Sequence, residues 1–245
     1  MFKPQVTTGA YDDADFTDEF IWAAAELYIT THQDSYYQAV KMFPDDKMPL
    51  PSWSQVRLLG YYSLVRFEAQ LTSIAASDFD GLRRRLIESA DLMAKGILQQ
   101  PYQVIMGQSK DDFVWGSNAV AANQAIQMIQ VYKLTRDKKY LAYAQSNVDY
   151  LLGRNATGYS YVTGFGFPKP MHPHHRPSEA DGINDPVPGF LVGGPNPGMQ
   201  DKCEYPSKLT DEAYVDSVCS YASNEVAINW NAPLVYLLFA MEALQ

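Results

Sequence analysis

The chain has 245 residues, enough for one large domain or two small ones, and a hydrophobic share of 47% is sufficient for a buried core. Its 28 acidic and 19 basic residues give a formal charge of -9, which argues against nucleic acid and other polyanionic partners. The sequence contains neither the roughly 20 apolar residues of a membrane span nor the basic and apolar pattern of a signal peptide. The aromatic share of 13% favours a neutral, partly apolar ligand such as a sugar.

Helical periodicity begins at Asp18 and continues to about His32, with Thr17 predicted as the N-cap. The residues expected on the buried face of this helix are Phe20, Ala24, Leu27 and Tyr28. Further helices are predicted at residues 55–71, around the apolar positions of 82–97, at about 117–135, and around 141–151 and 234–244. The predicted fold class is therefore all-α, built from successive helical hairpins.

The stretch from Gly153 to Pro206 differs in composition, because nine of the 15 glycines and nine of the 15 prolines lie in it. It cannot form a long helix. Apolar residues such as Tyr161 and Phe190 argue against disorder, and long ordered loops usually carry function. We therefore expect an ordered functional loop, with at most a small hairpin at SYVTGFG and GFLVGG.

The two cysteines, Cys203 and Cys219, both lie in the irregular carboxy-terminal region. Two buried or free thiols are the commoner arrangement, and one disulfide is the alternative. The sequence leaves both open, because it cannot test the geometry that a disulfide needs.

Three of the four histidines fall within MHPHHRPS, as His172, His174 and His175, directly before Arg176. Clustered imidazoles suggest a zinc site, but this spacing lacks the helical H-E-x-x-H framework and a thiolate partner. The other interpretation is a polar ledge in which His174 and Arg176 donate hydrogen bonds to ligand hydroxyls. We prefer the ledge and predict no metal here.

A second group of polar residues lies in AYVDSVCSYASNEVAINW, where Asp216 and Glu225 stand nine residues apart. Glu225 opens an apolar run. If the carboxyl is partly desolvated there, its pKa is raised, as a general acid working near neutral pH requires. The alternative is an ordinary glutamate at a helix N-terminus, stabilised by the helix dipole. Spacing alone does not separate the two.

These motifs also carry a resemblance to a known family. The runs DYLLGRNATGYSYVTGFG, HPHHRPS, PVPGFLVGGPN and YVDSVCSYASNEVAINWNAPLVYLL are similar to family 9 of the glycoside hydrolases, the inverting cellulases built as an (α/α)6 barrel. FVWGSNAVAANQAI and TTGAYDDADFTDEFIWAAAELYITT extend the resemblance over essentially the whole chain. It implies that residues 1–245 are the C-terminal half of one such domain, an incomplete (α/α)6 barrel of an endo-β-1,4-glucanase.

Carried over to this sequence, the resemblance implies a role for each candidate residue. Glu225 protonates the departing glycosidic oxygen, and Asp216 supports it. His174, also expected to be catalytic, and Arg176 hold a glucosyl unit of the β-glucan or cello-oligosaccharide substrate. The aromatic candidates for the cleft, each of which also suits core packing, are Trp115, Tyr221 and Trp230.

Two features depart from the family pattern. The D-A-G-D-like motif, whose carboxylates activate the attacking water in the family, does not occur in this sequence, and Asp12 to Asp15 is not a substitute. We therefore expect the catalytic base to come from a missing N-terminal half, or the open face to be buried in a homo-oligomer. The alternatives are a catalytically silent glucan-binding module and an inactive truncation. The other departure is Pro168, where the family usually has a basic or amide residue.

No cofactor is expected, and a calcium ion is the one candidate. The segment around Asp18 and Glu19 resembles a calcium-binding stretch of some relatives, but Ser54 stands where those relatives have a carboxylate. Because family members are usually exported, the resemblance implies an extracellular protein, although this chain shows no signal peptide of its own.

Overall fold

The structure is a computed structural model that describes residues 13–244. The beginning of the TTGAYDD segment, with Asp12, lies outside the described residues. The chain divides into two compact units, the first ending at Arg85 and the second beginning at Leu86. Helix α4 (Ser73–Ala94) carries the chain across this boundary. That the whole chain forms one domain stays a prediction.

The first unit is built on helix α1 (Thr17–Thr31), which packs against α2 (Asp34–Gln38) and α3 (Arg57–Arg66). A 3-10 turn at Glu68–Gln70 follows α3, so the helix predicted at residues 55–71 is a shorter helix and a turn. All the predicted helices are present. None of the helices within residues 13–244 combines the length and apolar character of a membrane span.

Two details predicted for α1 are wrong. Thr17 is not a cap but the first helical residue, and its hydroxyl donates a hydrogen bond to Asp15 (2.6 Å). Phe20 and Leu27 are 65% and 44% exposed, so they flank the buried face instead of forming it. The buried stripe follows the regular i, i+3, i+4, i+7 spacing of a helix face and consists of Ile21, Ala24, Ala25 and Tyr28.

The second unit is built on α5 (Ser117–Thr135), α6 (Lys139–Leu151) and α9 (Ile228–Ala243), with α5 packed against both other helices. Helix α5 has the predicted bounds, and its Ala121 and Ala125 are fully buried. Asn147 of α6 is also fully buried. It donates to the Ala121 carbonyl (2.8 Å) and to Gln124 Oε1 (3.0 Å), and it accepts from the Met106 N–H (3.0 Å). One amide side chain therefore links α5, α6 and the segment before them.

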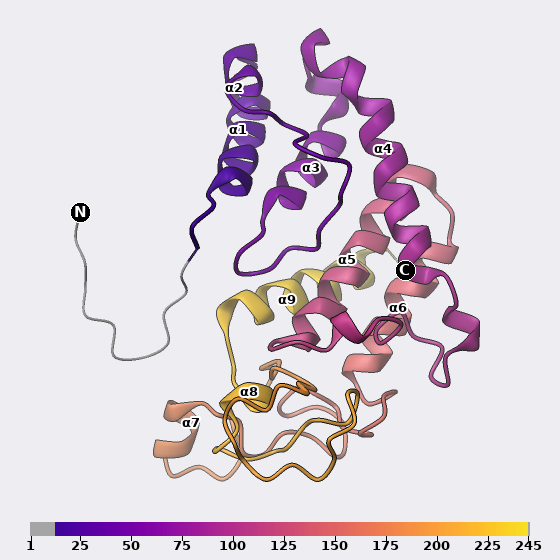
Figure 1. The fold of residues 1–245 in the computed structure, drawn as a ribbon. Helices are drawn as coiled ribbons and strands as arrows, with labels where there is room; N and C mark the ends of the chain where they lie inside the picture. The colour runs from indigo at the N-terminus through magenta and orange to yellow at the C-terminus, as the bar shows by residue number, and fades with distance from the viewer. Residues whose placement is uncertain (1–12, 245) are drawn as a thin grey trace, which may run out of the picture. The chain divides into compact units, whose positions relative to one another are not determined.

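The chain between α6 and α9 gathers at one end of these helices, together with the short α7 (Arg176–Ala180) and α8 (Tyr221–Asn224) (Figure 1). The prediction of an ordered loop with little strand is confirmed. A single antiparallel bridge from Val162 to Leu191 joins the two segments that were expected to pair. Helices α2, α7 and α8 were not predicted, because four or five residues are too few to show a helical period.

Replacing Asn147 by alanine should lower the free energy of unfolding by about 1–3 kcal/mol, because the Met106 N–H loses its buried acceptor. The control is Gln145→Ala on the same helix, whose side chain bonds only Asp149 one turn away. That change should cost no more than about 0.5 kcal/mol. Urea unfolding of both variants makes the comparison, and equal midpoints would show that Asn147 does not tie the helices together.

Candidate active site

Separate segments of the second unit meet at Glu225 through backbone hydrogen bonds. The His174 N–H donates to the Asn224 carbonyl (2.8 Å), and the Gly193 N–H donates to the Glu225 carbonyl (3.0 Å). His174 and Glu225 thus form a parallel bridge. Because the carbonyl groups of Asn224 and Glu225 accept N–H groups from two other segments, the backbone at Glu225 is held in place.

Asn118, near the start of α5, holds the segment that contains Gly193. Its N–H donates to the Gly193 carbonyl (3.0 Å), and its side-chain Nδ2 donates to the Val192 carbonyl (2.8 Å). The next residue, Gly194, has φ +89°, and a Cβ there would lie 2.4 Å from the Asn118 side chain. Only glycine fits this close approach.

The Glu225 carboxyl is half-buried at the end of α8. Burial raises its pKa above the usual value, and a hydrogen bond with the Trp115 side chain and the charge of His174 offset only part of the rise. The residue does not open a helix, since it follows α8 and precedes Ala227, the N-cap of α9. Glu225 is therefore not the ordinary N-terminal helix glutamate, and its environment suits a general acid.

His174 presents one ring nitrogen for a ligand. Its Nδ1 lies 2.5 Å from the Val218 carbonyl, and because a carbonyl can only accept, Nδ1 carries the proton. Nε2 is left to accept a hydrogen bond when the ring is neutral and to donate one when it is protonated. The ring meets Tyr221 edge-on, with centroids 6.0 Å apart.

Asp216 holds the histidine-bearing segment. Its carboxylate accepts the N–H groups of Met171 (2.8 Å) and His172 (2.9 Å) and the Asn224 side-chain amide (3.0 Å). The same amide donates to the His172 carbonyl (2.7 Å), and Asn224 Oδ1 accepts from the Tyr214 hydroxyl (2.7 Å). Asp216 therefore positions the backbone that leads to His174.

The other residues of the histidine cluster differ in exposure. His175 caps α7, with Nδ1 2.9 Å from Ser178 Oγ, and its ring lies 4.9 Å from that of Phe190. His172 and Arg176 are exposed. His175 therefore has a structural role as a helix cap, and the ligand-binding roles of His174 and Arg176 stay predictions.

The three aromatic candidates occupy different environments. Trp115, 42% exposed, and Tyr221 form a tilted pair with ring centroids 5.5 Å apart beside Glu225. Trp230 is only 7% exposed, and a Cβ on Gly116 would lie 2.6 Å from its Nε1. Trp115 and Tyr221 can therefore meet a ligand, whereas Trp230 packs beneath the backbone.

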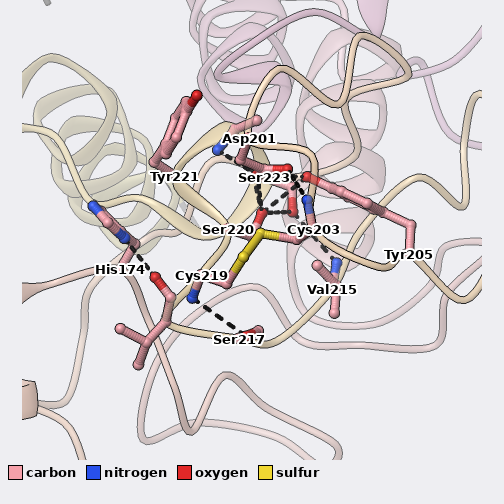
Figure 2. The surroundings of a disulfide bond; sticks show 12 residues. His174, Asp201, Cys203, Tyr205, Val215, Ser217, Cys219, Ser220, Tyr221 and Ser223 are labelled. Carbon is pink, nitrogen blue, oxygen red and sulfur yellow. Dashed lines mark hydrogen bonds between the residues drawn. A yellow bond between two sulfur atoms is a disulfide. The ribbon is translucent and has the colours of Figure 1, made fainter.

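Cys203 and Cys219 form a disulfide (Figure 2), so of the two arrangements left open by the sequence the less common one occurs. It ties the segment after Asp201 to the residues directly before α8. Sequence reasoning missed Asp201 as well as Asn118 and Asn224. The signal that the sequence offered for Asn224 was its position as a polar residue directly before Glu225.

The predicted calcium segment lies in the first unit. Asp18 is 5% exposed and accepts the Val56 N–H (2.5 Å), while Glu19 Oε2 and Asp13 Oδ2 are buried without a hydrogen-bond partner. Although its own backbone N–H lowers the pKa of Glu19, burial and the Asp18 carboxylate raise it above its usual value. Unpaired carboxylate oxygens suit a cation. However, no three His, Cys, Asp or Glu side chains in the described part of the chain form a metal-binding group, so calcium stays a prediction.

A half-buried carboxyl beside an aromatic pair is compatible with a glycoside hydrolase, in which a carboxylic acid protonates the leaving oxygen. Residues 2–238 match the family described as Glycosyl hydrolase family 9, and the chain belongs to this family.

The chain is similar to the "Xyloglucan-specific endo-beta-1,4-glucanase BoGH9A" of Bacteroides ovatus, with 44% identity over 99% of this chain and 42% of the relative. The "Cellulose 1,4-beta-cellobiosidase" of Acetivibrio thermocellus is 32% identical over 94% of this chain and 28% of that protein. The solved structure "Bacteroides ovatus GH9" matches with a TM-score of 0.90 and 41% identity, covering 99% of this chain and 43% of the other. A mutant thermostable endoglucanase from Alicyclobacillus acidocaldarius matches with a TM-score of 0.84 and 34% identity, covering 98% and 46%.

This chain spans less than half the length of these relatives, and it corresponds to the C-terminal half of the Bacteroides ovatus relative. The family's structures have the (α/α)6 barrel fold, so the predicted fold class, an all-α incomplete (α/α)6 barrel, is confirmed.

Replacing Asp216 by asparagine should loosen the segment at Met171 and His172, because an amide nitrogen would face a backbone N–H that needs an acceptor. Hydrogen exchange of these two amides should then be roughly 10-fold faster or more. Asp185→Asn, an equal change at an exposed residue of the same loop, is the control and should leave both rates unchanged. Unaltered exchange in the Asp216 variant would contradict this role.

Proposed function

We propose that this chain carries the general acid and part of the substrate cleft of an endo-β-1,4-glucanase that inverts the anomeric carbon. The observation that supports this best is the half-buried Glu225 carboxyl with its raised pKa, beside Trp115 and His174. An acid that keeps its proton at higher pH can protonate a glycosidic oxygen as the bond breaks.

The other residues of the site have roles that follow from their contacts. The Trp115 and Tyr221 rings offer apolar faces on which a sugar ring can stack. His174 Nε2 and the exposed Arg176 guanidinium supply hydrogen-bonding groups for its hydroxyls. Asp216 holds the backbone that leads to His174, because its carboxylate accepts the N–H groups of Met171 and His172.

An inverting enzyme also needs a carboxylate base roughly 6.5–9.5 Å from the acid, across the scissile bond, to activate water. We propose that this base comes from the region of the relatives that the match to this chain does not cover. It can be joined in the same polypeptide or supplied by another chain, including a second copy.

The proposed substrate is a glucan with a β-1,4-linked backbone, because the two relatives described above are named an endo-beta-1,4-glucanase and a 1,4-beta-cellobiosidase. One relative is named for xyloglucan and the other for cellulose, so the proposal covers both polysaccharides. An extracellular location is proposed with it, and the Cys203–Cys219 disulfide supports that location, since such bonds persist in oxidising compartments.

The test of this proposal is hydrolysis of soluble β-1,4-glucan by this chain together with the rest of its domain. Reducing sugar should appear as the inverted anomer by NMR, and Glu225→Gln should lower the rate by about 10²–10⁴-fold. Asp185→Asn serves as the control and should keep full activity. Binding of cello-oligosaccharide without any hydrolysis would instead favour a glucan-binding module, for which the exposed Trp115 and the half-buried Tyr221 are suited.

A second prediction concerns the stability of this chain alone. Because the folded-state pKa of Glu225 is raised, its stabilising contribution is present below the unfolded-state value and is lost as pH rises through the folded-state value. Glutamine mimics the protonated carboxyl. Glu225→Gln should therefore be more stable than the parent at pH 7, and the difference should vanish on lowering the pH below about 4. Thermal unfolding across this range measures it, and a variant less stable at pH 7 would contradict the assigned shift.

A further inference from the structure

Asp201 is the centre of a hydrogen-bond cluster beside the disulfide (Figure 2). Its Oδ2 accepts from the Ser220 hydroxyl (2.7 Å), the Tyr205 hydroxyl (2.8 Å) and the Ala222 N–H (2.9 Å). Its Oδ1 accepts the Cys203 N–H (3.1 Å). Although burial raises it, these hydrogen bonds hold the pKa of the Asp201 carboxyl below its usual value, so the group is a charged acceptor at neutral pH.

This cluster fixes the start of α8. Ser220 is the N-cap of that helix, and its hydroxyl accepts the Ser223 N–H (3.2 Å) while donating to Asp201. Asp201 also accepts the N–H of Ala222 within the first turn. A helix of four residues has too few internal hydrogen bonds to hold itself, so its place depends on such outside contacts.

Tyr221 is the first residue of α8. Asp201 holds the backbone on either side of it, and Gln200 binds its hydroxyl. Its backbone lies between Ser220 and Ala222, both bonded to Asp201. Its hydroxyl donates to the Gln200 carbonyl (3.0 Å). The ring therefore has a set position.

On the ligand side, the Tyr221 ring packs against Trp115, with centroids 5.5 Å apart. Burial raises the pKa of the Glu225 carboxyl, and the Trp115 side chain, as a hydrogen-bonding group, lowers it in part. The groups that act on Glu225 are thus Trp115, from the segment before α5, and His174, from the histidine segment. The Tyr221 ring adjoins both of them, since it also meets the His174 ring edge-on, with centroids 6.0 Å apart.

We propose that Asp201 is a positioning residue for Glu225, because it anchors α8, which ends at Glu225 and whose Tyr221 ring packs against both Trp115 and His174. The inference rests on the proposed function in that Glu225 is taken as the acid. The proposal means that Asp201 and Glu225, two carboxylates that do not touch, are coupled through α8 and its Tyr221 ring.

The test is the titration of the Glu225 carboxyl carbon, followed by ¹³C NMR in the complete chain without substrate. Asp201→Asn should move the midpoint to higher pH, because the Trp115 hydrogen bond that favours the ionised carboxylate is weakened. In a Trp115→Phe background, which lacks the indole N–H, the shift caused by Asp201→Asn should be smaller. Asp185→Asn is the matched control and should leave the midpoint in place.

A purely structural Asp201 would lower the unfolding temperature and leave the Glu225 midpoint unchanged, or shift it equally in both backgrounds, and either result overturns the proposal. If Asp201→Asn does not fold, Tyr221→Phe replaces it, since it removes only the hydroxyl that bonds Gln200. That variant should move the midpoint in the same direction by a smaller amount, and an unmoved midpoint overturns the proposal. The titration needs no turnover, so its outcome is independent of whether the chain hydrolyses glucan.

Discussion

The carbonyl groups of Asn224 and Glu225 accept backbone N–H groups from two other segments of the loop region, and the site is organised around this pairing. One bond brings His174 to the acid, and the other brings the glycine-rich segment at Gly193 over it. Partial burial of the Glu225 side chain follows from this closure. The raised pKa is thus a product of the loop topology, because a carboxyl at a free loop end would be hydrated.

A region with so little regular secondary structure needs other acceptors and donors for its backbone groups, and side chains supply them. Asn118 donates to the segment of Val192, Asp216 accepts two successive N–H groups of the histidine segment, and Asp201 accepts those of Cys203 and Ala222. The contacts of Asn118 and Asp216 join segments that are far apart in sequence, and those of Asp201 lie beside the disulfide. The polar residues of the loop therefore supply the backbone hydrogen bonds that the ladders of a sheet would otherwise provide.

How far the sequence predicts this structure depends on whether a feature is periodic or long-range. Helix α5 was predicted with its bounds, because its apolar positions repeat at helical spacing over 19 residues. The buried face of α1 was misplaced, since apolar side chains such as Phe20 and Leu27 surround that helix on more than one side. The partly desolvated setting of Glu225 was predictable from the apolar residues that follow it.

The contacts that position the site were not predictable in the same way. Hydrogen bonds from Asp201 and Asn224 join residues through the folded loop, and no local pattern marks which polar side chain will receive which N–H. Cys203 and Cys219 gave two arrangements that only geometry separates. The family motifs supplied the candidate residues, but the tautomer of His174 and the burial of Trp230, in contrast to Trp115, depend on the folded structure.

The proposed function requires Glu225 to donate a proton to the leaving group. The dependence of the hydrolysis rate on the leaving group tests that role. Hydrolysis by Glu225→Gln is measured on a β-1,4-glucan, whose leaving alcohol needs a proton, and on an aryl cellobioside with a dinitrophenolate leaving group, which does not. If Glu225 donates the proton, the hydrolysis rate of Glu225→Gln falls by about 10²–10⁴-fold on the glucan and by much less on the aryl substrate. Equal losses on the two substrates would contradict it, because they would mean that Glu225 supports the site without donating the proton.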